Sequence, residues 1–254
     1  MEILAWTAPP TLSVFDVGQG DGILLSAGGH QILVDGGPDG SLLSRLGHAM
    51  PFFDRRIDLL VLSHPHLDHL HAFPELLRRY RVDAVLFTGV DYASPRYEEF
   101  LELLAEERAR VLVADPDADL TVGPFAVDVL WPPPGYFGVP MKDVNDNSTA
   151  LRVSVADGKS VLLTGDMEER QEGEMLRAGV DVSADILKVA HHGSRTSSST
   201  GFLLAANPSL AVASVAAENS YGLPDEDILA RYASLGIPLR LTKDEGTIVV
   251  PLSD

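Results

Sequence analysis

Cysteine is absent from this chain of 254 residues. Its absence excludes disulfides, thiolate metal sites and cysteine nucleophiles, so any catalysis or metal binding must use other side chains. Long hydrophobic runs are missing too, because the most apolar stretch, Leu210 to Ala217, is far shorter than the ~18 residues that span a bilayer. The first residues, Met1 to Trp6, lack the basic segment and apolar core of a signal peptide. We therefore expect a soluble domain, and the sequence leaves its cellular location open.

Basic residues are scarce: 19 Lys and Arg stand against 37 Asp and Glu, which gives a net charge of −18. Such a surface repels a polyanion and excludes a protein that coats nucleic acid non-specifically. Nucleic acid remains a candidate substrate for a metal site, because bound cations are often the largest local charges in a site. The apolar fraction of 45% is that of an ordinary folded domain.

Apolar strand-like segments alternate with helical segments, which predicts an α/β fold. The order repeats along the chain. Residues 57–64 match residues 184–191 in an acidic residue, an apolar strand and a terminal histidine, and residues 31–37 match residues 160–166. We infer two pseudo-symmetric halves whose polar strand ends converge, followed by a final hairpin through residues 239–250.

The domain boundary is expected near residue 10. Pro9 and Pro10 are typical of a linker, so residues 1–10 are interpreted as a linker or as residues added to the domain. Residues 11–254 are expected to form a single domain, which is compatible with excision from a longer protein.

The strongest chemical signal is the run H-P-H-L-D-H over residues 64–69. Four of the eight histidines of the chain fall within residues 64–71. Imidazole and carboxylate are ligands for zinc, manganese and iron, and a turn after a buried strand lets alternate residues face one point. We interpret the run as a metal site rather than as a polar helix start capped by Asp68.

Further candidate ligands follow two later strands. Asp166 ends the run T-G-D, where a carboxylate can bridge two cations, although it can also cap the next helix. His191 and His192 end the following strand. Because the repeat aligns His191 with His64, we favour His191 as a ligand and leave His192 to support a ligand or contact a phosphate. The alternative is a pair of ordinary loop histidines.

These motifs resemble a known family. H-P-H-L-D-H, T-G-D and H-H-G-S, preceded by D-V-G-Q-G-D at residues 16–21 and L-V-D-G-G at residues 33–37, resemble the metallo-β-lactamase superfamily. Together with N-D-N-S at residues 145–148 and L-K-V-A-H-H-G-S, they are similar to the C-terminal hydrolase domain of the ComEC family of bacterial DNA-uptake channel proteins. The resemblance runs from about residue 12 to residue 250.

The resemblance implies a four-layer αββα metallo-β-lactamase sandwich with two divalent cations, zinc or manganese, at one edge. It implies that His64 and His66 hold the first cation and that Asp68 and His69 hold the second. Asp166 would bridge them. The ligand set is completed by His191 or His192, and the catalytic candidates are Asp68 and Asp166. Asp35 corresponds to an aspartate that orients a ligating histidine.

Two positions depart from the family pattern. Many relatives carry another metal-binding histidine between the first cluster and the bridging aspartate, but this chain has no histidine between His71 and His191. Asp146, or its neighbour Asn145, is the substitute we expect. Leu223 stands where the ComEC pattern N-x-Y-G-H-P has a histidine, which puts in doubt whatever that histidine does for phosphate binding or leaving-group protonation.

Polar residues near these motifs are candidates for contact with a substrate. Ser194, Asn219 and Tyr221 would contact a phosphate or support the ligands, and Arg195 would add positive charge.

Three functions remain open at this point. The first is a metal-dependent phosphodiesterase that cleaves DNA, with single-stranded DNA as the expected substrate, in a domain that would be membrane-associated through its parent protein. The second is a small-molecule hydrolase on the same fold, such as a phosphocholine esterase or a lactonase, since fold does not determine substrate. The third is a binding domain that has lost catalysis. The oligomeric state is left open.

Overall fold

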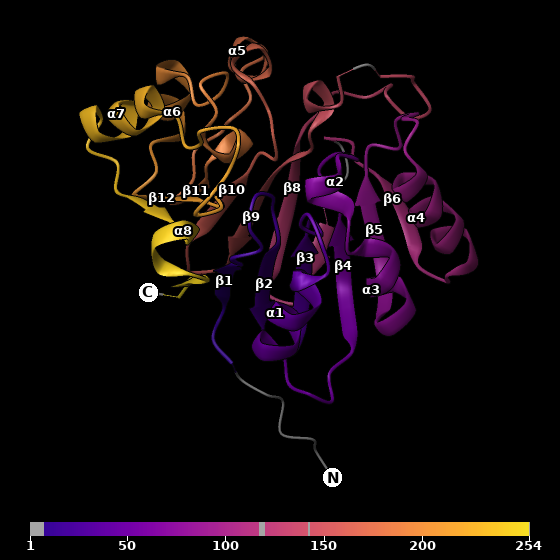
Figure 1. Cartoon of the computed structure of the whole chain (residues 1–254). Helices are drawn as coiled ribbons and strands as arrows, with labels where there is room; N and C mark the ends of the chain where they lie inside the picture. The colour runs from indigo at the N-terminus through magenta and orange to yellow at the C-terminus, as the bar shows by residue number, and fades with distance from the viewer. Residues whose placement is uncertain (1–7, 117–119, 142, 254) are drawn as a thin grey trace.

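Two seven-stranded sheets form the centre of the computed structural model, which describes residues 8–116, 120–141 and 143–253 (Figure 1). In spatial order, the first sheet consists of β14 (Ile248–Pro251), β1 (Thr11–Val14), β2 (Ile23–Ala27), β3 (His30–Val34), β4 (Arg56–Val61), β5 (Arg81–Phe87) and β6 (Arg110–Val113). The second consists of β7 (Leu120–Val122), β8 (Phe125–Trp131), β9 (Ala150–Val155), β10 (Ser160–Leu163), β11 (Ile186–Lys188), β12 (Leu210–Ala213) and β13 (Leu239–Leu241).

The two sheets have the same pairing pattern. In the first, β14, β1, β2 and β3 pair antiparallel in turn, and β3, β4, β5 and β6 pair parallel. In the second, β7 to β10 pair antiparallel and β10 to β13 pair parallel. The expected pseudo-symmetry is therefore confirmed, with β3 equivalent to β10 and β4 to β11.

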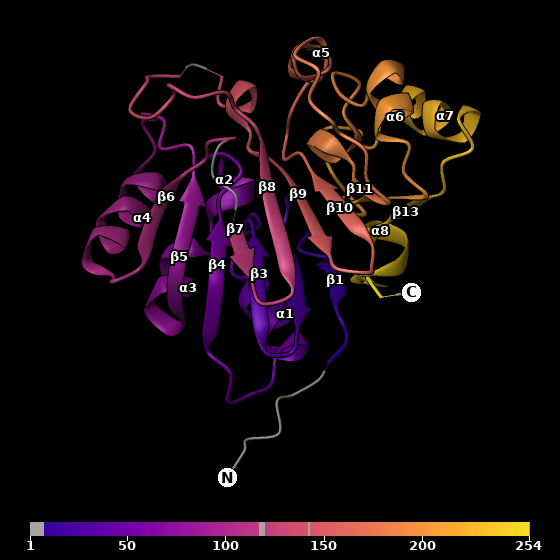
Figure 2. The same ribbon diagram turned by 180° about the vertical axis from the view of Figure 1, so that it is seen from behind.

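Helices cover the outer face of each sheet, as Figures 1 and 2 show from opposite sides. The first sheet carries α1 (Ser41–Ala49), the short α2 (Leu67–Leu70), α3 (Phe73–Arg79) and α4 (Pro95–Glu106). The second carries α5 (Glu169–Arg177), α6 (Thr200–Ala206) and α7 (Glu226–Ser234), and α8 (Thr242–Glu245) precedes β14. A short 3-10 helix spans Asn145–Asn147, and Ala190–Gly193 forms a kinked turn.

Alternate side chains along the strands point to opposite faces of each sheet, and the buried apolar residues form three cores. Leu25 and Val61 point between the sheets, where they pack with Val127 and Val161. Leu24 and other residues of the opposite parity pack against α1, α3 and α4, and a third core lies between the second sheet and α5, α6 and α7. The expected four-layer αββα arrangement is confirmed.

The last third of the chain departs from the prediction. The hairpin expected over residues 239–250 does not form, because β13 pairs parallel with β12 in the second sheet and β14 pairs antiparallel with β1 in the first. Helix α8 connects them across the two sheets. Helix α6 was not predicted.

The N-terminal linker prediction falls mostly on residues 1–7, which lie outside the described residues. Within the described part of the chain, we find no helix that combines the length and the apolar character needed to cross a bilayer.

Candidate metal centre

The carboxyl ends of β3, β4, β10 and β11 meet at one edge of the sandwich, the usual place for ligands in parallel sheets. Asp35 follows β3 and is buried. Its carboxylate accepts hydrogen bonds from Ser63 N at 2.8 Å, Ser63 Oγ at 2.7 Å and His69 Nδ1 at 2.8 Å. This contact turns Nε2 of His69 towards the space between the two halves.

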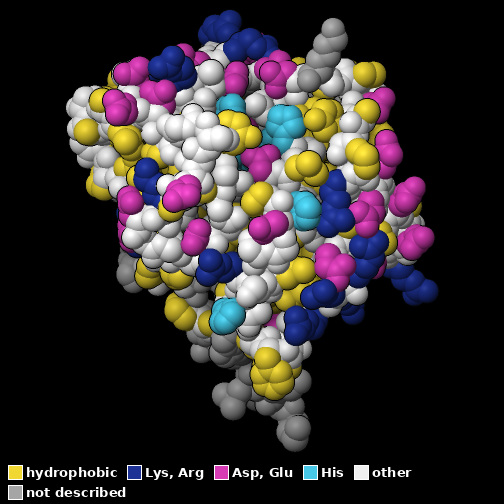
Figure 3. Space-filling model, viewed as in Figure 1, with side chains coloured by type: hydrophobic (Ala, Val, Ile, Leu, Met, Phe, Trp, Pro, Cys, Tyr) yellow, Lys and Arg dark blue, Asp and Glu magenta, His cyan; other side chains and the backbone are white. Residues whose placement is uncertain are grey.

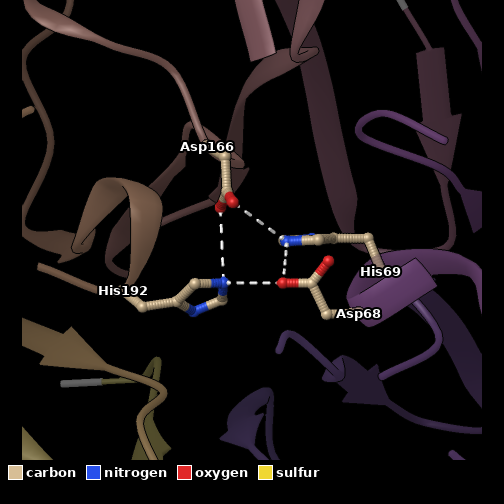
Figure 4. Close-up of side chains that lie close together, drawn as sticks. All are labelled: Asp68, His69, Asp166 and His192. Carbon is tan, nitrogen blue, oxygen red and sulfur yellow. Dashed lines mark ion pairs between the residues drawn. The ribbon is translucent and has the colours of Figure 1, made fainter. Parts of the chain in front are cut away.

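Four side chains converge there: Asp68 and His69 on α2, Asp166 after β10 and His192 after β11 (Figure 4). Asp166 Oδ2 lies 3.3 Å from His69 Nε2, and Asp166 Oδ1 lies 3.6 Å from His192 Nε2. Asp68 Oδ2 lies 3.7 Å from His69 Nε2 and 3.5 Å from His192 Nε2. One donor atom from each residue thus lies within 4.8 Å of the other three.

Three of these donor atoms are buried without a hydrogen bond. Among the described residues, no hydrogen-bond partner reaches His69 Nε2, His192 Nε2 or Asp166 Oδ1. Unpaired buried polar atoms are costly, so three of them aimed at one point require an explanation. Imidazole nitrogens and carboxylate oxygens are donors for transition-metal cations, and the cluster fits one such ion.

A second group of donors shares Asp166. His64 Nε2 lies 3.1 Å from His66 Nδ1 and 3.9 Å from Asp166 Oδ2. His191 Nε2 lies 3.8 Å from the same carboxylate oxygen. Asp166 therefore has one oxygen near His192 and the other near His64, His69 and His191. The site has donors for two cations.

The carboxylates and histidines of the site strongly change one another's pKa values. Burial acts to raise the pKa of Asp166, but attraction to His69 and His192 outweighs it and holds the pKa well below the usual range. Burial acts to lower the pKa of His69, yet Asp166 and Asp35 raise it well above its ordinary value. Burial holds the pKa of His64 well below the usual range.

A buried ion pair lies behind His192. Lys188, in β11, donates from Nζ to Asp21 Oδ2 at 2.8 Å and to Val189 O at 3.0 Å, and both Lys188 and Asp21 are 1% exposed. His192 Nδ1 lies 3.0 Å from Ser214 O, to which it donates, so its Nε2 faces the cluster. The pair joins the loop after β1 to a strand of the other half.

Glycine in the run D-V-G-Q-G-D explains how Asp21 reaches this position. Gly20 has φ +148°, and a Cβ there would lie 2.3 Å from the carbonyl oxygen of Asp68. Asp21 N donates to that same carbonyl at 3.2 Å. The loop therefore passes directly over α2, which only glycine permits.

Backbone strain also concentrates here. His191 and His192 have φ of 49° and 53°, and Asp35 has φ of 63°. Such values cost non-glycine residues of order 1–3 kcal/mol each and cluster at functional sites. The two adjacent left-handed residues bring both imidazoles to Asp166, although the sequence interpretation favoured only His191 as a ligand.

A cavity of about 370 Å³ opens over the cluster. Its walls include His66, Asp68, Asp166, His191 and His192, and also Gln19, Leu67, Tyr92, Asn145, Tyr221 and Leu223. Figure 3 shows histidine at the surface toward the top of the face drawn in Figure 1, with acidic and basic side chains interspersed over that face. Within the described residues, no Lys or Arg lines this cavity.

Of the remaining candidate residues, some line the cavity and others do not. Asp146 is not among the described lining residues, because it pairs with Arg170 at 2.8 Å and accepts a hydrogen bond from Gln171. Its neighbour Asn145 does line the cavity and is 8% exposed, and its Oδ1 has no partner among the described residues. Tyr221 lines the cavity and is 74% exposed.

The other polar candidates are engaged with the protein itself. Asn219 accepts from Leu223 N and donates to Leu223 O, each at 2.9 Å, so it shapes the loop that carries Leu223. Ser194 Oγ lies 3.0 Å from Thr196 Oγ1, and Arg195 pairs with Asp225 at 3.2 Å.

Lys188, Ser63 and Tyr92 belong to the site but were not predicted from the sequence. Lys188 had a usable signal, because a lysine inside an otherwise apolar buried strand needs a partner. Ser63 and Tyr92 had none, since their roles depend on the spatial neighbours Asp35 and His66.

The chain is similar to known proteins in sequence and in fold. A family model described as the metallo-beta-lactamase superfamily matches residues 15–216. The chain is 27% identical to ComE operon protein 3 of Bacillus subtilis (strain 168), over 93% of the chain and 32% of that protein. It is 30% identical to competence protein ComA of Neisseria gonorrhoeae, over 93% of the chain and 31% of that protein. The chain thus spans about a third of the length of these relatives.

Solved structures share the fold. The metallo-beta-lactamase fold protein YhfI of Bacillus subtilis superposes with a TM-score of 0.64 at 18% identity, covering 95% of this chain and 99% of that protein. CmlA of Streptomyces venezuelae, described as a diiron beta-hydroxylase, superposes with a TM-score of 0.60 at 17% identity, over 96% of this chain and 54% of CmlA.

Proposed function

This chain belongs to the metallo-beta-lactamase superfamily of metal-dependent hydrolases, and from that premise we propose that it hydrolyses phosphodiester bonds in single-stranded DNA. The observation that carries the proposal is Asp166, whose Oδ1 lies near His192 and whose Oδ2 lies near His64, His69 and His191. A carboxylate in that position can bridge two cations, the arrangement used in two-metal phosphodiester hydrolysis.

In the proposed ligand set, each of the adjacent histidines serves a different cation. His64, His66 and His191 would hold the first, and Asp68, His69 and His192 would hold the second, with Asp166 available to both. His191 then takes the place of the histidine that the chain lacks between residues 71 and 191, so no ligand is required from Asp146. Zinc and manganese both suit these donors.

When bound, two cations supply an activated water and positive charge for the phosphoryl oxygens. The chain itself orients the donors, because Asp35 fixes the ring of His69 and Ser214 O fixes the ring of His192. Asn145 and Tyr221 line the cavity, and in the proposed role each would donate a hydrogen bond to a phosphate. Ser194 is a weaker candidate because it lies beside the lining rather than in it.

DNA is favoured as the substrate by the relatives named for competence. Single strands are favoured because a chain with a net charge of −18 repels a second strand, whereas one flexible backbone can enter the cavity. Membrane association through a longer parent protein belongs to the same proposal.

A small-molecule hydrolase is the second candidate. The cavity over the cluster has no Lys or Arg among its described lining residues, and a small uncharged ester or lactone would not need one. A binding domain without catalysis is disfavoured, because the unpaired donors His69 Nε2 and His192 Nε2 remain in place.

Cleavage assays distinguish these functions. Metal-free protein is loaded with manganese or zinc and offered matched single-stranded and duplex DNA, methyl p-nitrophenyl phosphate and a lactone. We expect cleavage of single-stranded DNA, loss of cleavage on chelation and in Asp68→Ala, and no change in Glu107→Ala, which removes an exposed carboxylate just past the end of α4. Hydrolysis of the lactone without any DNA cleavage would replace the proposal with the second candidate.

A further inference from the structure

A second cavity adjoins the metal cavity, and one residue belongs to the walls of both. This cavity has a volume of about 340 Å³ and is lined by residues of the β5–α4 connection, of α4 and of the segment around Phe137. Tyr92 lines both cavities, and its ring centroid lies 5.9 Å from that of the proposed ligand His66. The two cavities therefore share Tyr92 as a wall residue, and we call the second one the Phe137 cavity.

Phe137 is held in place although most of its ring is open to solvent. The side chain is 62% exposed. Its ring packs on Gly89, where a Cβ would lie 2.3 Å from Phe137 Cδ2. Backbone hydrogen bonds from Gly138 N to Gly89 O at 2.8 Å and from Asp91 N to Val139 O at 3.0 Å attach the segment to the β5–α4 connection. An aromatic ring fixed at the mouth of a cavity offers a flat apolar surface to a ligand.

The polar groups of the Phe137 cavity select the chemistry of that ligand. Asp91 and Glu98 contribute carboxylates, while Lys, Arg and His are absent from its described lining. A phosphate would be repelled there. A neutral planar ring with N–H donors would stack on the aromatic wall and donate to the carboxylates.

We propose that the Phe137 cavity is a nucleobase subsite, which binds one base of single-stranded DNA next to the phosphodiester held at the cations. The inference rests on the proposed function and adds a binding site to it. It explains how a chain of net charge −18 holds a polyanion, because stacking of bases on aromatic side chains contributes affinity without neutralising phosphates. It also explains a requirement for single strands, since a base inside a duplex is not free to enter.

The subsite has a base preference that follows from its acceptors. Adenine, cytosine and guanine carry exocyclic amino groups, and thymine carries none. Carboxylates at Asp91 and Glu98 therefore favour the first three bases over thymine.

The test compares ordinary oligonucleotides with abasic ones of the same length, which keep the backbone and lack the bases. The measured quantity is the ratio of kcat/KM for oligo-dC to kcat/KM for the abasic strand, in the metal-loaded protein. We expect Phe137→Ala to lower this ratio roughly 5- to 150-fold, the range of base–aromatic stacking, with a smaller loss for Phe137→Leu. The matched control is Phe53→Ala, which removes a ring that is 76% exposed between α1 and β4 and should leave the ratio unchanged. Oligo-dT should be cleaved less efficiently than oligo-dC.

The outcomes separate the subsite from the proposed function. If the wild-type protein cuts DNA and Phe137→Ala leaves the ratio unchanged, the subsite is overturned and the proposed function stands. If the wild-type protein cuts no DNA but hydrolyses methyl p-nitrophenyl phosphate or a lactone, both are overturned. Thermal unfolding of each variant verifies that the fold is retained.

Discussion

Replacing Lys188 with methionine is expected to destabilise the protein strongly, although the side chain touches no proposed ligand atom. Methionine has a similar length but cannot donate to Asp21. The substitution would leave the Asp21 carboxylate 1% exposed and without the cation that now lies 2.8 Å from it. Asp21 Oδ1 already has no hydrogen-bond partner among the described residues, and His192 Nδ1, which lies 3.6 Å from it, donates to Ser214 O instead.

The magnitude follows from the geometry. At 2.8 Å and an effective dielectric of about 20, the attraction between the two charges is about 6 kcal/mol. Part of this attraction offsets the desolvation of both groups, and removal of one partner of a buried pair typically costs about 3–5 kcal/mol. For a chain of this size, that loss lowers the unfolding midpoint by roughly 6–20 °C. The double variant Lys188→Met, Asp21→Leu removes both charges and should recover most of the loss, because an apolar pair of similar volume replaces the ion pair.

Urea unfolding of the metal-free proteins, followed by circular dichroism, measures these free energies. Lys243→Met is the matched control, since Lys243 is only partly buried in α8, and it should change the free energy of unfolding by less than about 0.5 kcal/mol. A cost below about 1 kcal/mol for Lys188→Met, or a double variant less stable than Lys188→Met alone, would refute the reasoning.

Two further predictions concern the metal cavity. Asp35→Asn removes the carboxylate that orients His69 and should weaken metal affinity about 10- to 100-fold, as measured by competition with a chromogenic chelator; affinity equal to wild type would contradict the orienting role. Leu223→His places an imidazole on the cavity wall beside His191 and His192, and it should raise kcat for a phosphodiester about tenfold, below the ~100-fold of a fully positioned general acid. Because Leu223 is only partly buried, the midpoint of thermal unfolding of the Leu223→His variant should stay close to that of the wild-type protein. A large fall in this midpoint with unchanged kcat would show that Leu223 serves packing alone.

Strand identity was predictable where the sequence is both apolar and bounded by turns. The match between residues 57–64 and 184–191 even predicted the pseudo-symmetry, because equivalent strands carry equivalent apolar runs and end in the same residue type. The C-terminal strands were not predictable. Residues 239–241 and 248–251 are short, and the polar segment between them is typical of a hairpin turn, so nothing local indicates that the two strands join different sheets.

The candidate site was likewise predictable only in part. The histidine run after β4 predicted side chains that lie close together in the structure, because their spacing is local. The positions of His191 and His192 depend on two left-handed backbone conformations, which no side-chain pattern predicts for histidine. Asp146 was nominated for its carboxylate, but Arg170 and Gln171 occupy that group, and only the packing of α5 against residues 145–147 makes this visible.

The number of cations bound per chain decides whether Asp166 serves a two-metal centre. Metal-free protein is titrated with manganese, and bound metal is counted by elemental analysis and by electron paramagnetic resonance, which detects two neighbouring ions through their magnetic coupling. The account predicts two coupled ions in the wild-type protein and loss of the coupled pair in Asp166→Ala, because Asp166 lies in both donor groups. A single uncoupled ion in the wild-type protein, or an intact pair in Asp166→Ala, would contradict it.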